Sequence, residues 1–184
     1  RDINHRLSRL KSYTIAALSE DRTLGATSIR QELDNLRYAG LVYGQTIYNK
    51  APIVMDKLVE FIGEEAFQKG IREYLTTYAY GNATWPDLIA ILDSYTDEDL
   101  ASFSDVWVHQ KGMPHINLTI ENDELIVSQN DPLGRDILWT QSFNCRIIYN
   151  QEVTEEIEVV MNKKQQRCRL REGAVAILPN SCGR

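Results

Sequence analysis

Apolar residues recur at helical spacing through the first part of the chain, where the i, i+3, i+4 pattern predicts amphipathic helices. Between residues 22 and 35 this spacing is lost, and Gly25, Thr27 and Ser28 favour an irregular segment on the surface. The helical positions are Ile3, Leu7, Leu10, Ala17 and Leu18; Phe67, Ile71, Tyr74, Leu75 and Tyr78; Leu88, Ile91, Leu92 and Tyr95; and Leu100, Phe103, Val106 and Trp107.

Residues with strong positional preferences mark where these helices begin and end. A helix is expected to begin near Tyr48 and to end at Gly63, and Gly81 is expected to end the next one, because glycine tolerates the left-handed conformation. The segments Thr84-Trp-Pro-Asp and Thr96-Asp-Glu-Asp have the form of capping boxes, in which a hydroxyl and a carboxylate bind free first-turn amides.

After Pro114 the apolar period becomes two, which predicts β-strands. A hairpin is expected around Asn122-Asp123, and about six strands in all. We therefore predict an α+β chain, with a helical unit at residues 1–113 and a small antiparallel β-sandwich at residues 114–184. The alternating positions are Ile116, Leu118 and Ile120; Leu125 and Val127; Phe143, Cys145, Ile147 and Tyr149; Ile157, Val159 and Met161; and Cys168 and Leu170, followed by residues 174–178.

Composition and charge narrow the function classes. The 184 residues are 43% hydrophobic, enough to bury the core of one ordinary domain or two small ones. A net charge of −6 opposes nucleic acid as a partner, because phosphate binding needs clustered basic residues. The densest basic run, at residues 163–171, alternates with other residues and is interpreted as the exposed face of a strand. No apolar run approaches the roughly 20 residues of a membrane span.

Few side chains have the spacing that a metal site or a nucleophile would need. The histidines are His5, His109 and His115, and the last two lie on either side of Gly112 and Pro114, so no zinc site is predicted in this chain. Three cysteines without C-x-x-C spacing are interpreted as inert thiols, and Cys145 and Cys168 as inward-facing ones. Paired carboxylates at residues 64–65 and 97–99 fall at expected helix starts, where negative charge is favoured. No Gly-x-Ser-x-Gly motif appears.

One series of motifs is more specific. Tyr48-Asn-Lys-Ala-Pro52, Gly63-Glu-Glu-Ala-Phe67, Tyr80-Gly-Asn-Ala-Thr84 and Trp107-Val-His-Gln-Lys-Gly-Met-Pro114 occur in this order. Their order and spacing resemble the gluzincin zinc aminopeptidases, the family of aminopeptidase N and the leukotriene-hydrolysing peptidases. Ala51-Pro52 departs from the commoner Gly-Ala of that family. Further matched positions are Gly70, Tyr74, Asp87, Leu88 and Gly112.

The resemblance implies a catalytic role for Tyr48. In that family the matching tyrosine directs its phenol at the substrate carbonyl, where a hydroxyl donor stabilises the developing oxyanion. The same resemblance implies that residues 1–113 are the helical second half of a thermolysin-like catalytic domain and that peptides are the substrate. From the residues alone, a tyrosine near a helix start is interpreted as a packing residue or a surface hydrogen-bonding group, and only the resemblance assigns it a catalytic role.

The zinc motif of the family, His-Glu-x-x-His, is absent from the sequence, as are the later zinc-binding Glu and the strand that holds the substrate amine. The resemblance therefore implies that the chain is a piece of a zinc aminopeptidase lacking the metal site and is inactive alone. The alternative is a non-catalytic helical and β scaffold or interaction module. The sequence encoded before Arg1 distinguishes the two.

Overall fold

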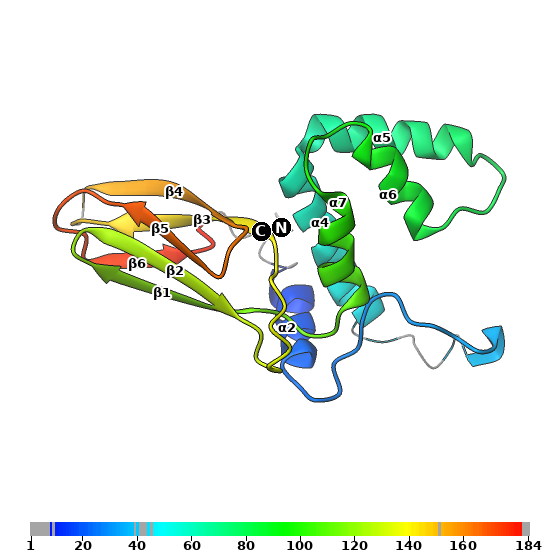
Figure 1. Cartoon of the computed structure of the whole chain (residues 1–184), viewed down its shortest axis with the longest axis horizontal. Coiled ribbons are helices and arrows are strands. Elements are labelled where there is room, and N and C mark those ends of the chain that lie inside the picture. The colour runs from blue at the N-terminus through cyan, green and yellow to red at the C-terminus, as the bar shows by residue number, and fades with distance from the viewer. Residues whose placement is uncertain are drawn as a thin grey trace, which may run out of the picture.

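The computed structural model describes residues 8, 10–38, 40, 44, 46–150 and 152–181 (Figure 1). Helices fill the first part of the chain and strands the second, so the predicted α+β class is confirmed. The expected helical positions Ile3 and Leu7, together with His5 and Cys182, lie outside the described residues.

The helical part contains two longer helices, α4 and α5, and several shorter segments. A π-helical turn, Leu10–Thr14, leads into α2 (Ile15–Asp21), and the segment 22–35 is irregular, as predicted. After a 3-10 turn at Leu36–Tyr38 comes a second π-helical turn, Thr46–Lys50, which continues directly into α4. The remaining helices are α4 (Ala51–Ile62), α5 (Glu64–Thr77), α6 (Trp85–Asp93) and α7 (Leu100–Ser104), with a last π-helical turn at Asp105–His109.

Two of the predicted helix boundaries are confirmed. Gly63 caps α4 with φ of 84°, a left-handed value, and its N–H donates to the carbonyl of Val59. Thr84 and Asp87 form the expected capping box at the start of α6, where the Thr84 N–H donates to the Asp87 carboxylate at 2.8 Å.

Two other boundaries were predicted wrongly. The helix expected to start at Thr96 starts after Asp99, because the Asp99 carboxylate itself accepts the N–H of Ser102 at 2.9 Å and serves as the cap. Helix α5 ends at Thr77, before Gly81, and Tyr80 adopts the left-handed conformation with φ of 60°. At the start of α7, a first-turn amide is bound by the carboxylate of Asp99 and not by the hydroxyl of Thr96. A pattern of residue types does not show which of two nearby polar side chains will serve as the cap.

The strands form two three-stranded antiparallel sheets. Strand β1 (His115–Glu121) pairs with β2 (Glu124–Asn130), which pairs with β5 (Gln165–Arg169). In the other sheet β3 (Gln141–Ile148) lies between β4 (Thr154–Met161) and β6 (Ala176–Pro179). The β1–β2 hairpin turns at Asn122 and Asp123, both with positive φ, as the sequence predicted.

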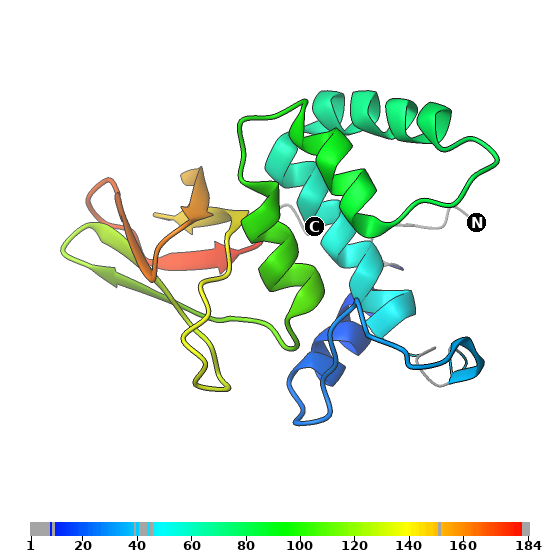
Figure 2. The ribbon, with the colours of Figure 1, turned by 45° about the vertical axis from the view of Figure 1, so that its right-hand side comes forward.

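Each part of the chain has its own apolar cluster. Helix α5 runs across the ends of α4 and α6 in Figures 1 and 2. The helical cluster comprises Val54, Leu58, Leu88, Leu92, Leu100, Phe103, Trp107, Val108 and Trp139. The cluster between the sheets comprises Leu125, Val127, Cys145, Ile147, Val159, Met161 and Leu170.

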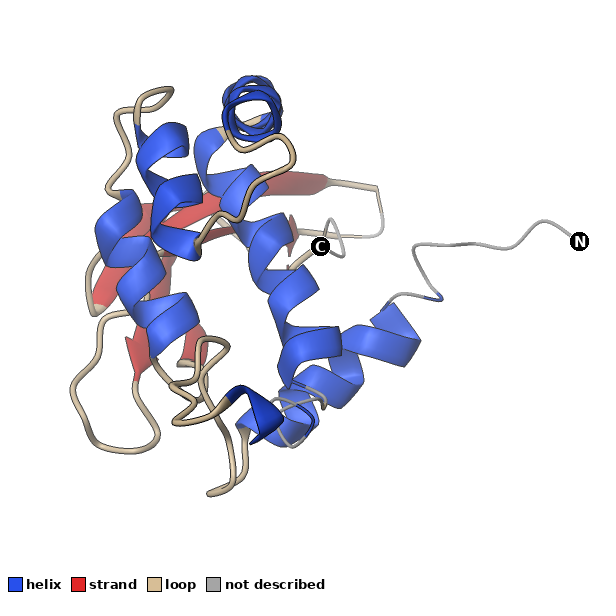
Figure 3. Cartoon of the chain, turned by 90° about the vertical axis from the view of Figure 1, so that its right-hand side faces the viewer, coloured by secondary structure: helices blue, strands red, loops and turns tan. Residues whose placement is uncertain are grey.

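The two parts are joined through the segment between β2 and β3. This segment carries Trp139 into the helical cluster, where its ring meets Trp107 edge-on at a centroid distance of 5.0 Å. The Trp107 indole N–H also donates to the carbonyl of Thr140 at 2.8 Å. In Figure 3 the helices lie in front of the strands as a separate layer. The predicted division at Pro114 stays a prediction, since the helical core uses residues from beyond it.

Further features agree with the sequence analysis. The Cys145 thiol is fully buried between the sheets, and burial raises its pKa to about 11, which keeps it protonated and unreactive. Arg167 of the basic run faces solvent and pairs with Glu124 across the sheet. None of the helices in the described part of the chain has the length and apolar character required to cross a bilayer.

Replacing Gly70 is expected to destabilise the helical part. A Cβ at Gly70 in α5 would lie 2.5 Å from a methyl group of Leu92 and 3.4 Å from its Cα in α6. We expect Gly70→Val to lower the free energy of unfolding by about 1–3 kcal/mol through overpacking. Gln68→Val, at an exposed position of the same helix, is the control and should cost at most about 0.7 kcal/mol. Equal losses in urea unfolding would contradict the close packing of α5 on α6.

Candidate functional site

Tyr48 lies on a turn whose other side chains are anchored inside the protein. In the π-helical turn before α4, Thr46, Asn49 and Lys50 are buried, whereas Tyr48 is 60% exposed. The Thr46 hydroxyl lies 3.0 Å from that of Thr27 in the irregular segment. The Tyr48 N–H donates to the carbonyl of Gly44 at 3.1 Å. The turn therefore holds the Tyr48 ring outward, away from both apolar clusters.

Lys50 anchors this turn through a buried ion pair. Its ammonium lies 3.0 Å from each carboxylate oxygen of Asp21 and donates to the carbonyl of Gly112 at 3.0 Å. The side chains of Lys50 and Asp21 are only 4% and 6% exposed. One cation thus connects the end of α2, the turn that bears Tyr48, and the loop that leads into β1.

Burial dominates the electrostatics of this pair. Desolvation raises the pKa of Asp21 and lowers that of Lys50, and in each case the attraction of the partner opposes the shift. Removal of two charges from water is costly, and the pair offsets that cost only because both groups remain hydrogen-bonded. Loss of one partner would leave the other charged and unpaired in the interior.

The Gly112 loop is held from its other side by an arginine. Arg135 donates to the Lys111 carbonyl at 2.9 Å and binds Asp131 at 2.7 and 2.9 Å. These hydrogen bonds lower the pKa of Asp131, which keeps its carboxylate charged. Gly112 has φ of 83°, a conformation that other residues adopt only under strain. We define Lys50, Asp21 and Gly112 as the buried clamp.

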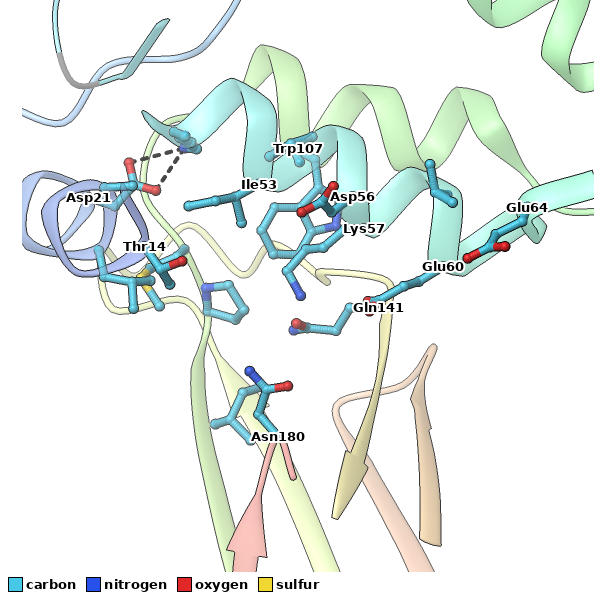
Figure 4. A pocket seen from close by; sticks show the side chains of 18 residues that line it. Thr14, Asp21, Ile53, Asp56, Lys57, Glu60, Glu64, Trp107, Gln141 and Asn180 are labelled. Carbon is cyan, nitrogen blue, oxygen red and sulfur yellow. Dashed lines mark hydrogen bonds and ion pairs between the residues drawn. The ribbon is translucent and has the colours of Figure 1, made fainter. Parts of the chain in front are cut away.

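A cavity lies where the helical part meets the sheets. It has a volume of about 440 Å³ and is lined by α2, by the side of α4, and by residues of β1 and β3 (Figure 4). Lys57, Glu60 and Gln141 contribute polar groups to it, and Ile53, Trp107 and Met113 contribute apolar ones. Tyr48 is not among its described lining residues, but Lys50 of the same turn and its partner Asp21 are, so the cavity borders the turn without including the Tyr48 ring.

The described residues do not form a zinc site. No group of three or more His, Cys, Asp or Glu side chains in this part of the chain is placed to hold a metal ion. His109 ends the last π-helical turn and His115 begins β1. The donor set therefore does not fit the zinc that the resemblance implies.

The sequence analysis singled out Tyr48 but missed the buried clamp. Lys50 and Gly112 were noted only as matched positions, and Asp21 was not noted at all. The two ends of the ion pair lie 29 residues apart and the Gly112 carbonyl 62 residues from Lys50, so no local spacing reveals them. Lys50 lies at the helical spacing of the buried Val54 and Leu58 that follow it, and this was the one signal available.

Comparison with known proteins places the chain in a family. The Peptidase family M1 domain matches residues 3–107. Aminopeptidase N of Lactococcus lactis subsp. lactis is 32% identical over 114 residues, which cover 61% of this chain and 13% of that protein. Aminopeptidase N of Lactococcus lactis subsp. cremoris is 32% identical over 134 residues, or 70% of this chain and 16% of that protein. Aminopeptidase M1-C of Oryza sativa subsp. japonica is 28% identical over 117 residues.

The chain belongs to the M1 peptidase family, because the family domain matches more than half of its residues. This confirms the resemblance drawn from the motifs between Tyr48 and Pro114. The curated relatives that it matches include proteins named aminopeptidase N. The chain spans about 13–16% of the length of the relatives described above.

Replacement of Lys50 alone should destabilise the protein strongly. Lys50→Met leaves the Asp21 carboxylate buried and unpaired. We expect the free energy of unfolding, measured in urea, to fall by about 3–5 kcal/mol. The double variant Asp21→Leu/Lys50→Met should recover part of this loss, since only the Gly112 carbonyl then lacks its donor, at about 1–3 kcal/mol.

Lys69→Met is the matched control. Lys69 pairs with Glu65 on the surface of α5, with side chains 55% and 84% exposed, and its loss should cost at most about 0.5 kcal/mol. A Lys50→Met variant as stable as Lys69→Met would show that the buried clamp contributes nothing to folding.

The chain by itself is expected to bind no stoichiometric zinc, because its described donors have no usable arrangement. The measurement is elemental analysis of protein purified without chelator. One tightly held zinc per chain would reveal a site that includes His109 or His115, or residues outside the described ranges.

Proposed function

We propose that the chain contributes part of the catalytic apparatus of a zinc-dependent aminopeptidase, which removes amino-terminal residues from peptides. In this proposal Tyr48 is the catalytic residue of the chain. Residues 1–113 form the helical half of a thermolysin-like catalytic domain, and residues 114–184 form a β-sandwich beside it.

The observation that carries the proposal is the presentation of Tyr48. A tyrosine that served only to pack would be buried, yet Tyr48 is 60% exposed on a turn whose flanking side chains are buried. A buried ion pair two residues away fixes this turn, and such rigidity is expected where a donor must meet a reacting atom. Membership of the M1 family supports the same conclusion.

The chemistry assigned to Tyr48 needs only its hydroxyl. A phenol hydroxyl is a hydrogen-bond donor. When a nucleophile attacks the carbonyl carbon of the scissile peptide bond, negative charge develops on the carbonyl oxygen. A donor already oriented toward that oxygen stabilises the transition state more than the substrate, because no reorganisation is needed as the charge forms.

The metal of such an enzyme is not assigned to this chain. The described residues offer no ligand set for zinc, so its ligands would come from another part of the same enzyme. By the same reasoning, the chain alone is expected to be inactive toward peptides.

Replacement of Tyr48 by Phe in the full-length protein that contains this chain tests its role. The variant loses one hydroxyl and keeps the ring, so packing and the turn are preserved. If the hydroxyl stabilises the oxyanion, kcat should fall by about a hundredfold or more, or about 2.7–4 kcal/mol. The Michaelis constant and the melting temperature should change little, because ground-state binding and folding do not use the hydroxyl.

Tyr38→Phe provides the control, since Tyr38 is exposed to a similar degree but lies outside the turn. It should retain full turnover. A Tyr48→Phe enzyme with more than about a third of the original turnover would remove the catalytic role and favour the scaffold alternative. A gene without a zinc motif before Arg1 would count against the peptidase as a whole.

A further inference from the structure

The ammonium group of Lys57 lies in the cavity between the helical part and the sheets. Lys57 points from α4 into this space, and its ammonium lies 5.3 Å from the centre of the Trp107 ring (Figure 4). Burial lowers the pKa of Lys57, and the charge of Glu60 opposes that shift. None of the ion pairs found between described residues includes Lys57. The Lys57 ammonium therefore has the Trp107 ring and the charge of Glu60 near it, but no direct ion pair among the described residues.

A second donor faces the same space from the other wall. Gln141, the first residue of β3, is only 8% exposed, and its side-chain Nε2 has no hydrogen-bond partner among the described residues. In Figure 4 the ends of the Gln141 and Lys57 side chains point toward one another across the cavity. A buried amide N–H without an acceptor costs about 1–3 kcal/mol, so the site lacks an acceptor group at this place.

Carboxylates accompany these two donors. Glu60 lies one helical turn after Lys57 and extends from α4 toward the same region (Figure 4). Glu64, at the start of α5, also lines the cavity. Asp56 and the paired Asp21 and Lys50 also line the cavity. Because acids outnumber lysines around it, a ligand that is only anionic would be repelled, and one that is only cationic would leave Lys57 and Gln141 unsatisfied.

The charges, the donors and the volume together define one class of ligand. We propose that this cavity binds a free apolar α-amino acid. Its carboxylate accepts hydrogen bonds from Lys57 and Gln141, and its ammonium faces Glu60. Its side chain packs against the apolar wall formed by Ile53, Met113 and Ile116. A volume of about 440 Å³ lies within the range of small-molecule sites and accommodates a leucine.

The ligand has a path into this site. A more open cleft of about 830 Å³ shares Lys57, Glu60 and Gln141 with the cavity and continues along β3 toward Asn144. An amino acid can therefore reach the two donors without a rearrangement of the backbone. Under the proposed function, free amino acids are the products of the enzyme, so this site would sense its product; the binding itself does not depend on that function.

Three matched probes test the proposal by calorimetry on the whole chain. L-leucine carries both charges, N-acetyl-L-leucine lacks the ammonium and L-leucinamide lacks the carboxylate. We expect saturable binding of one L-leucine per chain, and affinities at least about tenfold weaker for both blocked compounds, because each leaves one half of the site unpaired.

Variants assign each charge to its partner. Lys57→Met should weaken the binding of L-leucine at least about tenfold and leave the already weak binding of L-leucinamide unchanged. Glu60→Gln should weaken the binding of L-leucine but not that of N-acetyl-L-leucine. Gln141→Glu places a carboxylate opposite Lys57, so it should abolish binding and keep the fold, with an unchanged or higher melting temperature. Lys69→Met, on the surface of α5, should bind L-leucine as the original chain does.

The proposal is overturned if L-leucine shows no saturable binding, if the blocked compounds bind equally well, or if Gln141→Glu retains the original affinity. Because none of these measurements uses peptide hydrolysis, failure here leaves the role of Tyr48 intact. An inactive Tyr48→Phe enzyme that still binds L-leucine would likewise support both proposals separately.

Discussion

The buried ammonium of Lys50 is the contact on which the arrangement of the candidate site depends. It is the only group that touches the end of α2, the turn that bears Tyr48, and the Gly112 loop at once, as far as the described residues show. Hydrophobic burial alone would let these three segments slide against one another, because apolar contacts have no preferred direction. The Lys50 ammonium binds both carboxylate oxygens of Asp21 and the carbonyl of Gly112, so its position is well defined. Because Lys50 and Tyr48 lie on the same turn, these contacts also fix the position of Tyr48.

The same region shows why the two halves of the chain depend on each other. The Gly112 loop enters the first sheet, and Arg135, from the segment between the sheets, holds its other side. Trp139 of that segment completes the helical core against Trp107. The β part therefore supplies an anchor and a core side chain to the helical part. The predicted boundary at Pro114 follows the change in hydrophobic period, and the contact between Trp107 and Trp139 crosses it.

The elements were predictable because they depend on local spacing, whereas the site was not. The apolar period located the helices and strands, and Gly63, Thr84 and Asn122 marked their ends correctly. The prediction failed at Thr96, where the choice between two adjacent caps depends on which oxygen reaches the amide. Tyr48 was found only through a family resemblance. The buried clamp joins residues up to 62 positions apart, and a single sequence contains no record of such a pairing.

The contacts that hold the Tyr48 turn in place extend beyond the residues that the family domain matches. The M1 domain match ends at residue 107, yet the Lys50 ammonium donates to Gly112, and Trp107 packs on Trp139. A chain cut at residue 107 would keep every matched motif of the helices, but it would leave the Lys50 ammonium with only Asp21 and expose one side of the helical core. The Lys50 ammonium would lose one of its two buried acceptor groups, so we expect the turn that presents Tyr48 to be held less firmly. Residues beyond the family match, Gly112 and Trp139 among them, thus support the Tyr48 turn and the helical core.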